Sequence, residues 1–428
     1  MSGMKRNVVL ALAVAAAVSA PTAFATNGYF QHGYGVKAQG MGGAGVAYPQ
    51  DALAAATNPA GMALIGNRWD LGMSLFRPIR DTDISTANPT GTKYNAGSEI
   101  NFFVPEFGYN SMVSSDMSFG VSVYGNGGMN TSYTKPIALF SNGAGAAATN
   151  AGVDLSQLFI APTLAWKLSP GNAVGVSLNL AYQRFKATGL QNFNNTTQSS
   201  NPGHVTDNSY NGSTGVGLRL GWTGQVSSAV SVGATYQSKT KMSKFDKYSG
   251  LFAEQGEFDI PSNYAVGVAL KATPGTVVAL DVEKINYTDS KAVNNPLGPV
   301  SGAGQLQNTL GNNNGAGFGW QDMTVYKLGI SHNVNSNLTL RAGWNHGAQP
   351  IPSKETFFNL LAPGVVEDHY TLGATWKVDK ASEMSAMYMH AQEKEVKGSN
   401  SIPASFGGGE ANLKMYQNSF GLAYNKTY

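Results

Sequence analysis

The chain has 428 residues, no cysteine and a formal net charge of +3. Without cysteine it forms no disulfide bond and no thiolate metal site, and so small a net charge disfavours electrostatic binding of nucleic acid. Mean hydropathy is −0.17. Beyond the N-terminus no apolar run approaches the roughly 20 residues of a transmembrane helix, which excludes a helical membrane protein.

Residues 1–25 have the features of a signal peptide. Lys5 and Arg6 form a positive n-region, residues 8–18 are apolar, and residues 23–25 read Ala-Phe-Ala, a small-x-small cleavage site. We therefore predict that the mature chain begins at Thr26. The alternative, a transmembrane anchor, is disfavoured because the apolar stretch is too short to span a bilayer core.

Short stretches of alternating apolar and polar residues follow. Between residues 173 and 183 one side carries Val174, Val176, Leu178, Leu180 and Tyr182, and the other carries small or polar residues. The same alternation recurs at residues 263–271, 338–345 and 369–376. Because successive side chains of a strand point to opposite faces, each stretch predicts a strand with one apolar side.

The connections between these stretches alternate strictly between short turns and long polar segments. The long segments lie near residues 80–97, 126–152, 187–213, 243–257, 289–319, 347–364 and 396–411. Seven long and six short connections make thirteen, and hence fourteen strands. An even strand number with short periplasmic turns and long external loops predicts an all-β, 14-stranded antiparallel transmembrane β-barrel over residues 67–428. A β-sandwich has no reason to segregate its loops by length.

Residues 26–66 contain no alternating strand and are rich in Gly and Ala. A barrel of about fourteen strands encloses a lumen too wide for wall side chains to fill, so this segment is predicted to fold inside as a plug. Residues 40–45, Gly-Met-Gly-Gly-Ala-Gly, match the spacing of a dinucleotide-binding loop. No strand precedes them and Asp51 comes too early for the acidic partner, which excludes that interpretation.

Several motifs resemble the FadL family of outer-membrane transporters. The hatch-like elements are residues 40–44, Asp51, and Asn58-Pro59-Ala60-Gly61; further matches are residues 358–363 and 368–373. The resemblance implies a 14-stranded barrel of a Gram-negative outer membrane, an N-terminal hatch and a lateral exit. Its members take up long-chain fatty acids or toluene-like aromatics by passive diffusion. Asn58, Pro59 and Ala60 map onto the family's Asn-Pro-Ala motif, which implies a hatch or gating role.

A hydrophobic cargo needs an apolar surface outside and an apolar pocket within. The long connections supply exposed candidates for capture, which are Leu139, Phe140, Leu251, Phe252, Phe357 and Phe358. Large exposed apolar residues usually meet lipid or ligand. In the alternative the loops pack on one another to cap the barrel, and both can hold.

The resemblance implies that an N-terminal aromatic, here Tyr29 or Phe30, contacts the ligand; the alternative is packing within the plug. Alternation places Lys327 and Arg341 in the lumen, where they are candidates for a fatty-acid carboxylate clamp. Paired networks are the usual role of such charges, and a neutral aromatic cargo needs no clamp.

A lateral exit requires an interruption of the wall. Pro105 in the second strand, and Gly125, Gly127 and Gly128 at the end of the third, are the candidates because Pro and Gly interrupt ladder hydrogen bonds.

The leading hypothesis is an outer-membrane channel for hydrophobic small molecules such as long-chain fatty acids. The alternatives are an aromatic-hydrocarbon channel of the same family, a polar-solute porin, and a surface adhesin or phage receptor. An enzyme is disfavoured because no Gly-x-Ser-x-Gly elbow is present and the six histidines are scattered. We expect no cofactor and no metal. Expected partners are the hydrophobic substrate, outer-membrane lipid and, because the last strand ends in the aromatic Tyr428, the barrel assembly machinery; we expect a monomer.

Overall fold

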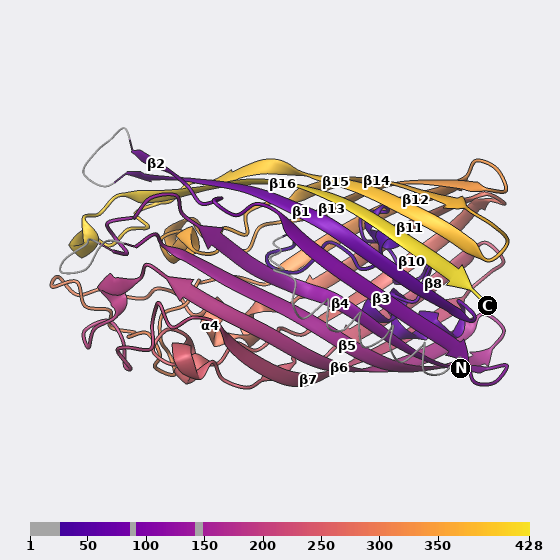
Figure 1. Cartoon of the computed structure of the whole chain (residues 1–428), viewed down its shortest axis with the longest axis horizontal. Helices are drawn as coiled ribbons and strands as arrows, with labels where there is room; N and C mark the ends of the chain where they lie inside the picture. The colour runs from indigo at the N-terminus through magenta and orange to yellow at the C-terminus, as the bar shows by residue number, and fades with distance from the viewer. Residues whose placement is uncertain (1–25, 86–90, 142–148) are drawn as a thin grey trace.

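The computed structural model describes residues 26–85, 91–141 and 149–428. One sheet contains sixteen strands, of which β2 (Thr92–Asn95) and β9 (Lys241–Met242) are short additions. The other fourteen form a barrel, closed where β1 (Arg68–Ser85) pairs antiparallel with β16 (Glu410–Thr427). The predicted fourteen-stranded barrel is confirmed (Figure 1). The predicted signal peptide lies outside the described residues.

The wall between β1 and β16 consists of consecutive antiparallel neighbours. These are β3 (Phe102–Met112), β4 (Met117–Ser132), β5 (Gly152–Ser169), β6 (Asn172–Thr188), β7 (Asn211–Gln225), β8 (Val230–Gln237), β10 (Asn263–Thr273), β11 (Thr276–Ile285), β12 (Met323–Asn333), β13 (Leu338–Gly347), β14 (Asp368–Lys377) and β15 (Ser382–Val396). Each strand therefore pairs with its sequence neighbours, as in an up-and-down barrel.

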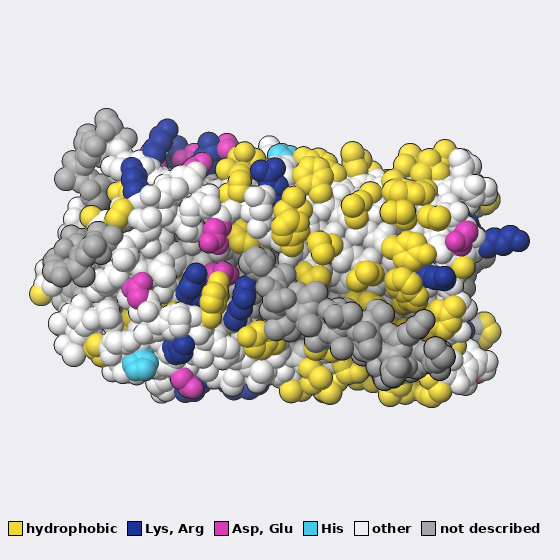
Figure 2. All heavy atoms as spheres, in the orientation of Figure 1, with side chains coloured by type: hydrophobic (Ala, Val, Ile, Leu, Met, Phe, Trp, Pro, Cys, Tyr) yellow, Lys and Arg dark blue, Asp and Glu magenta, His cyan; other side chains and the backbone are white. Residues whose placement is uncertain are grey.

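Alternation along the strands sorts residues between lipid and lumen. On β7, Leu218 and Leu220 are about half exposed (47% and 51%), whereas Arg219 between them is 3% exposed. Apolar side chains accordingly gather in a broad band over one half of the face that Figure 2 shows. This apolar band is the lipid-facing surface expected of a membrane barrel.

Short turns lie at one end of the barrel, together with the C-terminus, and long connections at the other (Figure 1). By the usual arrangement of outer-membrane barrels the long connections are external. Two strands reach further outward than predicted: β1 extends to Ser85 and β4 to Ser132. The external segments contain short helices, which are η3 (Gln191–Phe193), η4 (Asp246–Tyr248), α3 (Ala253–Gly256), η5 (Tyr287–Asp289), α4 (Lys291–Asn294), η6 (Ser353–Glu355), η7 (Phe358–Leu360) and η8 (Ala404–Phe406).

Residues 26–66 lie inside the barrel and contain α2 (Val36–Gln39), η1 (Ala54–Ala56) and η2 (Pro59–Ala63). We call this segment the hatch. It is mostly buried, and it bonds to wall strands on different sides of the lumen, including β3 through Glu106 and β11 through Asp281. Among the described residues, no helix is long and apolar enough to cross a membrane.

Candidate functional site

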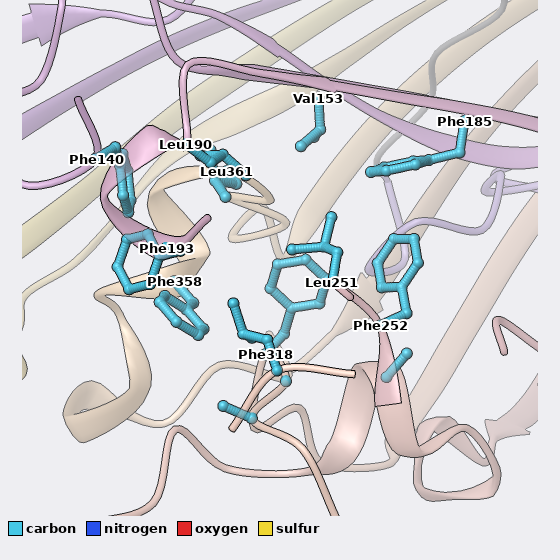
Figure 3. Close-up of a pocket in the computed structure, with 14 residues that line it drawn as sticks. Phe140, Val153, Phe185, Leu190, Phe193, Leu251, Phe252, Phe318, Phe358 and Leu361 are labelled. Carbon is cyan, nitrogen blue, oxygen red and sulfur yellow. The ribbon is translucent and has the colours of Figure 1, made fainter. Parts of the chain in front are cut away.

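A small apolar cavity lies between the external segments and the hatch (Figure 3). Its lining comprises Phe140, Val153, Phe185, Leu190, Phe193, Leu251, Phe252, Ala292, Leu310, Ala316, Gly317, Phe318, Phe358 and Leu361. Within the described part of the chain no charged or hydrogen-bonding side chain contributes to this lining. The cavity volume is about 40 Å³, room for about three water molecules at roughly 10–15 Å³ each. A hydrocarbon must therefore displace some of these side chains as it enters.

The six predicted capture residues do not form an exposed surface, and that prediction is corrected. Phe140 and Phe357 are fully buried and stack with ring centroids 5.5 Å apart. Phe252 and Phe358 are buried in the cavity lining, to which the half-buried Leu251 also belongs. Leu139 is half-buried against the same core. The external segments fold over the barrel mouth because burying these side chains removes apolar area from water.

Tyr29 and Phe30 lie one layer below the cavity. The Tyr29 ring lies 6.1 Å from that of Phe258 and 5.9 Å from that of Trp320. Phe258 in turn packs 4.9 Å from the cavity residue Phe252. Tyr29 and Phe30 thus form the part of the hatch nearest to the cavity but do not belong to the cavity lining.

Several aromatic and polar residues of this region were not among the predicted site residues. Phe185 was readable from alternation, since it lies on the lumen-facing row of β6 with Gln183. Phe318 lies in the connection at residues 289–319, which was regarded as polar, and Trp320 directly follows that range. The Trp320 indole donates to Asn359 Oδ1 at 2.5 Å, and the Asn359 amide donates to the Phe318 carbonyl at 2.7 Å. No local sequence pattern predicts that Asn359 contacts Phe318 and Trp320, because the two loops are distant in the chain.

Lys327 and Arg341 face the lumen but form no joint clamp. In the β12–β13 register Lys327 pairs with Asn345, four residues from Arg341, a separation of about 13 Å along the strand. Lys327 Nζ lies 2.7 Å from Glu283 Oε2. Arg341 donates to Gln50 Oε1 at 2.8 Å and to Thr375 at 2.7 Å. The predicted clamp is therefore corrected to two separate structural contacts.

The Asn-Pro-Ala segment ties the hatch to itself and to the wall. Asn58 caps η2 by accepting from the Ala60 N–H at 3.1 Å. Its amide donates to the Val46 carbonyl at 2.7 Å and to the Trp222 carbonyl on β7 at 2.9 Å. Wall glycines make room for it: a Cβ on Gly221 would stand 2.0 Å from Asn58 Oδ1.

Three wall carboxylates accept backbone N–H groups of the hatch. Asp281 accepts from residues 45 and 46 at 2.7 and 3.0 Å. Glu106 accepts from residues 35 and 36 at 3.1 and 3.0 Å, and Asp70 from residue 52 at 2.7 Å. The wall thus satisfies hatch N–H groups that burial would otherwise leave unpaired.

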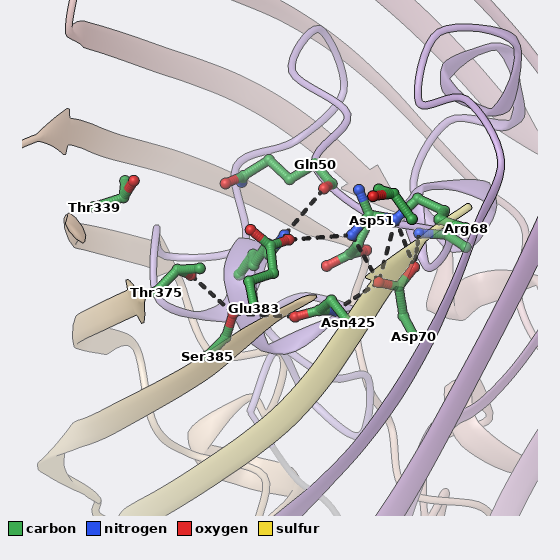
Figure 4. A network of polar contacts seen from close by, with 12 residues as sticks. Gln50, Asp51, Arg68, Asp70, Thr339, Thr375, Glu383, Ser385 and Asn425 are labelled. Carbon is green, nitrogen blue, oxygen red and sulfur yellow. Dashed lines mark hydrogen bonds and ion pairs between the residues drawn. The ribbon is translucent and has the colours of Figure 1, made fainter. Parts of the chain in front are cut away.

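An ion pair connects the hatch to the β15–β16–β1 side of the wall, next to further polar contacts within the wall (Figure 4). Lys37 of α2 pairs with Glu383 of β15. Arg68 binds Asp70 at 2.7 Å and lies 3.4 Å from Glu383. Asn425 donates to Asp70 Oδ1 at 2.6 Å. The Lys37 side chain is only 5% exposed. Without the Glu383 carboxylate its positive charge would be buried and uncompensated.

A pair of imidazoles also lies at the boundary between hatch and wall. His32 stacks on His369 of β14, with ring centroids 6.0 Å apart and planes 12° apart. Burial first, and then the neighbouring His369, lowers the pKa of His32 to about 3. The His32 imidazole is therefore neutral at pH 7.

The hydrogen-bond ladder between β3 and β4 is incomplete. It runs from the Phe107–Val123 pair to the Met112–Ser118 pair, whereas β3 begins at Phe102 and β4 continues to Ser132. The third wall strand therefore does not end at Gly125, Gly127 and Gly128, as predicted; they lie within β4, beside a bulge in its pairing with β5.

Hatch residues pair with the uncovered edge of β4. The Gly128 N–H donates to the Tyr29 carbonyl at 3.0 Å, and the Gln31 N–H to the Asn126 carbonyl at 3.2 Å. A Cβ on Gly127 would lie 1.9 Å from the Tyr29 carbonyl oxygen, so glycine permits this contact.

A closed barrel with an internal hatch below an apolar cavity defines an outer-membrane transport channel for hydrophobic compounds. The family model of the outer membrane protein transport proteins (OMPP1/FadL/TodX) matches residues 12–428, so the chain belongs to this family. Its members are transport channels rather than enzymes, and they reside in the outer membrane. A comparison with curated proteins found no match.

Solved structures show the same fold. The toluene transporter TodX of Pseudomonas putida superposes with a TM-score of 0.68 at 18% identity, covering 93% of this chain and 99% of that one. TbuX, a toluene transporter of Ralstonia pickettii, gives 0.65 at 17% identity with coverages of 93% and 99%. A FadL homologue of Pseudomonas aeruginosa gives 0.67 at 15% identity with coverages of 94% and 99%. Identities this low support the architecture alone.

Proposed function

We propose that the protein admits neutral hydrophobic small molecules, with monoaromatic hydrocarbons as the best-fitting class. The observation that carries this proposal is the cavity lining, which in the described residues contains apolar side chains alone. A carboxylate transferred into such surroundings without a partner pays a large desolvation cost. Lys327 and Arg341 are absent from the lining and already bonded elsewhere. Long-chain fatty acids, the leading expectation from the sequence, become the second candidate.

The proposed route leads from the cavity past Tyr29 and Phe30 to the interruption between β3 and β4. Substrate displaces residues 29–31 from the β4 edge and leaves sideways into the membrane past Gly125, Gly127 and Gly128. The incomplete ladder supports this route because no wall hydrogen bond there has to break. In this scheme Asn58, Pro59 and Ala60 anchor the lower hatch while its first residues move. No energy source is required, since apolar surface passes from one apolar environment to another.

A polar-solute porin is disfavoured because the hatch occupies the lumen and bonds to the wall on several sides. We further propose that the protein acts as a monomer, since the wall closes on itself. We also propose contact with outer-membrane lipid over the apolar band, and with the barrel assembly machinery during biogenesis.

Direct binding to the purified, detergent-exchanged protein tests the substrate class. Toluene and oleate are titrated in parallel against the wild type and Phe318→Asp, which places a charge in the cavity lining. Saturable toluene binding that Phe318→Asp abolishes supports the proposal. Oleate binding as tight as that of toluene, and lost in the same variant, would move the assignment to fatty acids. No binding of either ligand would refute the cavity as the substrate site.

Uptake by whole cells tests the lateral exit. Phe103→Cys and Gly125→Cys, which alternation places on the outer face on opposite sides of the incomplete ladder, are joined by a bifunctional maleimide; the native chain has no cysteine to interfere. We expect uptake of the bound substrate to stop while the barrel stays folded. The same reagent on Phe119→Cys and Leu164→Cys, which face each other in the intact β4–β5 ladder, is the control. Unchanged uptake through the cross-linked interruption would exclude this exit.

A further inference from the structure

A group of cations lies on the outer surface just beyond the apolar band. The lipid-facing row of β6 runs Leu178, Leu180 and Tyr182, and continues with Arg184 and Lys186. Figure 2 shows Lys and Arg side chains beyond the edge of the apolar band, over the external end of β6. Arg184 is four residues beyond Leu180, about 13 Å along the strand and, at the usual tilt of 35–45°, roughly 10 Å along the membrane normal.

This height matches the headgroup region of the outer leaflet. Leu178 and Leu180 are 39% and 40% exposed and face the hydrocarbon, and the next residue of the row, Tyr182, is of the type that marks the membrane interface. Residues directly above an interfacial aromatic meet lipid headgroups rather than acyl chains or bulk water.

The cations are held around a single tyrosine. The Arg184 guanidinium carbon lies 4.7 Å and the Lys186 Nζ 4.9 Å from the ring centroid of Tyr210. Lys247 Nζ donates to the Tyr210 carbonyl at 3.2 Å and to Ser209 Oγ at 3.0 Å. Cation–π contacts of this kind restrict otherwise flexible side chains. We call Arg184, Lys186 and Lys247 the cationic cluster.

Two carboxylates act on this cluster. Asp154 accepts from the Tyr210 hydroxyl at 2.6 Å, and the field of Glu99 also reaches Tyr210. Three cations against two anions leave an excess positive charge. The Tyr210 hydroxyl occupies one Asp154 oxygen.

We propose that the cationic cluster binds a phosphate group of an anionic glycolipid in the outer leaflet, whose acyl chains lie on Leu178, Leu180 and Tyr182. Arginine presents a planar fork that matches phosphate oxygens, and lysines add compact point charges. A lipid carries a phosphate group next to its acyl chains and therefore matches both the cationic cluster and the apolar row of β6 beside it. A free phosphate matches the cationic cluster alone. The inference depends on the outer-membrane location and not on the transported cargo.

Native mass spectrometry of the delipidated full-length protein tests this site, with bis-phosphorylated lipid A as the probe. The triple variant Arg184→Gln, Lys186→Gln, Lys247→Gln should bind at least tenfold more weakly than the wild type. The matched control is Lys394→Gln, Lys414→Gln, which removes two exposed cations already paired with Glu367 and Glu393; its binding should stay within twofold. Circular dichroism and heat-modifiability confirm that each variant keeps its barrel.

Two further arms separate the sources of phosphate. Enzymatically dephosphorylated lipid A should bind as weakly as the triple variant binds the intact lipid, and millimolar inorganic phosphate should not displace the lipid. Equal binding by wild type and triple variant, or by phosphorylated and dephosphorylated lipid, would overturn the proposal, as would displacement by inorganic phosphate. Toluene binding should be unchanged in the triple variant, so failure here is distinguishable from failure of the proposed cargo.

Discussion

Removing the carboxylate of Glu383 should release the hatch. Its partner Lys37 has a side chain that is 5% exposed, and burial lowers the pKa of Lys37, so the lone cation is poorly tolerated inside the barrel. Breaking a fully buried pair costs about 3–5 kcal/mol. Since the Glu383 side chain is 23% exposed, about 2 kcal/mol is the better value for Glu383→Gln. At roughly 1.4 kcal/mol per factor of ten, the released hatch becomes about 30-fold more populated.

Thiol labelling measures this population. Ala55 lies in η1 and is fully buried, and the chain has no native cysteine. The rate at which Ala55→Cys reacts with a bulky maleimide therefore reports how often the hatch opens, provided that closing is faster than reaction. We expect labelling about 30-fold faster in Glu383→Gln. Removing both charges with Lys37→Met in addition should restore most of the protection.

Glu393→Gln is the matched control. It breaks the Lys414–Glu393 pair, whose side chains are 45% and 50% exposed outside the lumen, so the labelling rate should change less than twofold. An unchanged rate in Glu383→Gln, or an equal increase in both variants, would refute the idea that this ion pair holds the hatch.

Three more outcomes are expected. Gly221→Val should displace the Asn58 side chain, which costs about 1–3 kcal/mol and lowers the melting temperature. Gly302→Ala, with open space around its Cβ, should leave the melting temperature unchanged. Equal melting temperatures of the two variants would contradict the close fit between Gly221 and Asn58. Phe252→Ala should enlarge the cavity and raise the ratio of naphthalene to toluene affinity at least tenfold in calorimetric titrations, and an unchanged ratio would show that Phe252 does not limit ligand size. On lowering the pH from 7.5 to 5, His32 itself should favour the released hatch, because a solvated His32 gains a proton below about pH 6.5 while in the closed hatch its pKa is about 3; this contribution reaches about 2 kcal/mol at pH 5. The labelling rate of Ala55→Cys, divided at each pH by that of the unfolded protein because only the thiolate reacts, should therefore increase about 30-fold more with the native His32 than with His32→Gln, and an equal pH dependence in both would contradict this origin.

Some features of the site were open to prediction and others were not. Asn58 was identified from its motif, but its bonds to Val46 and Trp222 appear only when β7 lies beside η2. Phe140, Leu251, Phe252 and Phe358 were predicted to be exposed capture residues, whereas they line the internal cavity. A sequence states that a loop residue is apolar; whether it points outward or into the barrel mouth depends on how the loops cover one another.

The sequence by itself determined the class of architecture. Alternation with a period of two is a local property of each strand, and the alternating lengths of the connections add up along the chain to an even, closed barrel with its long loops on one side. The tertiary structure alone decided which charges meet and where the wall is interrupted. Lys327 and Arg341 share a lumen-facing row in the sequence pattern, but the register places them about 13 Å apart along the strand. The part of the β4 edge that β3 leaves to the hatch depends on where the β3–β4 ladder stops, and alternation within each strand carries no information on where a ladder between two strands ends.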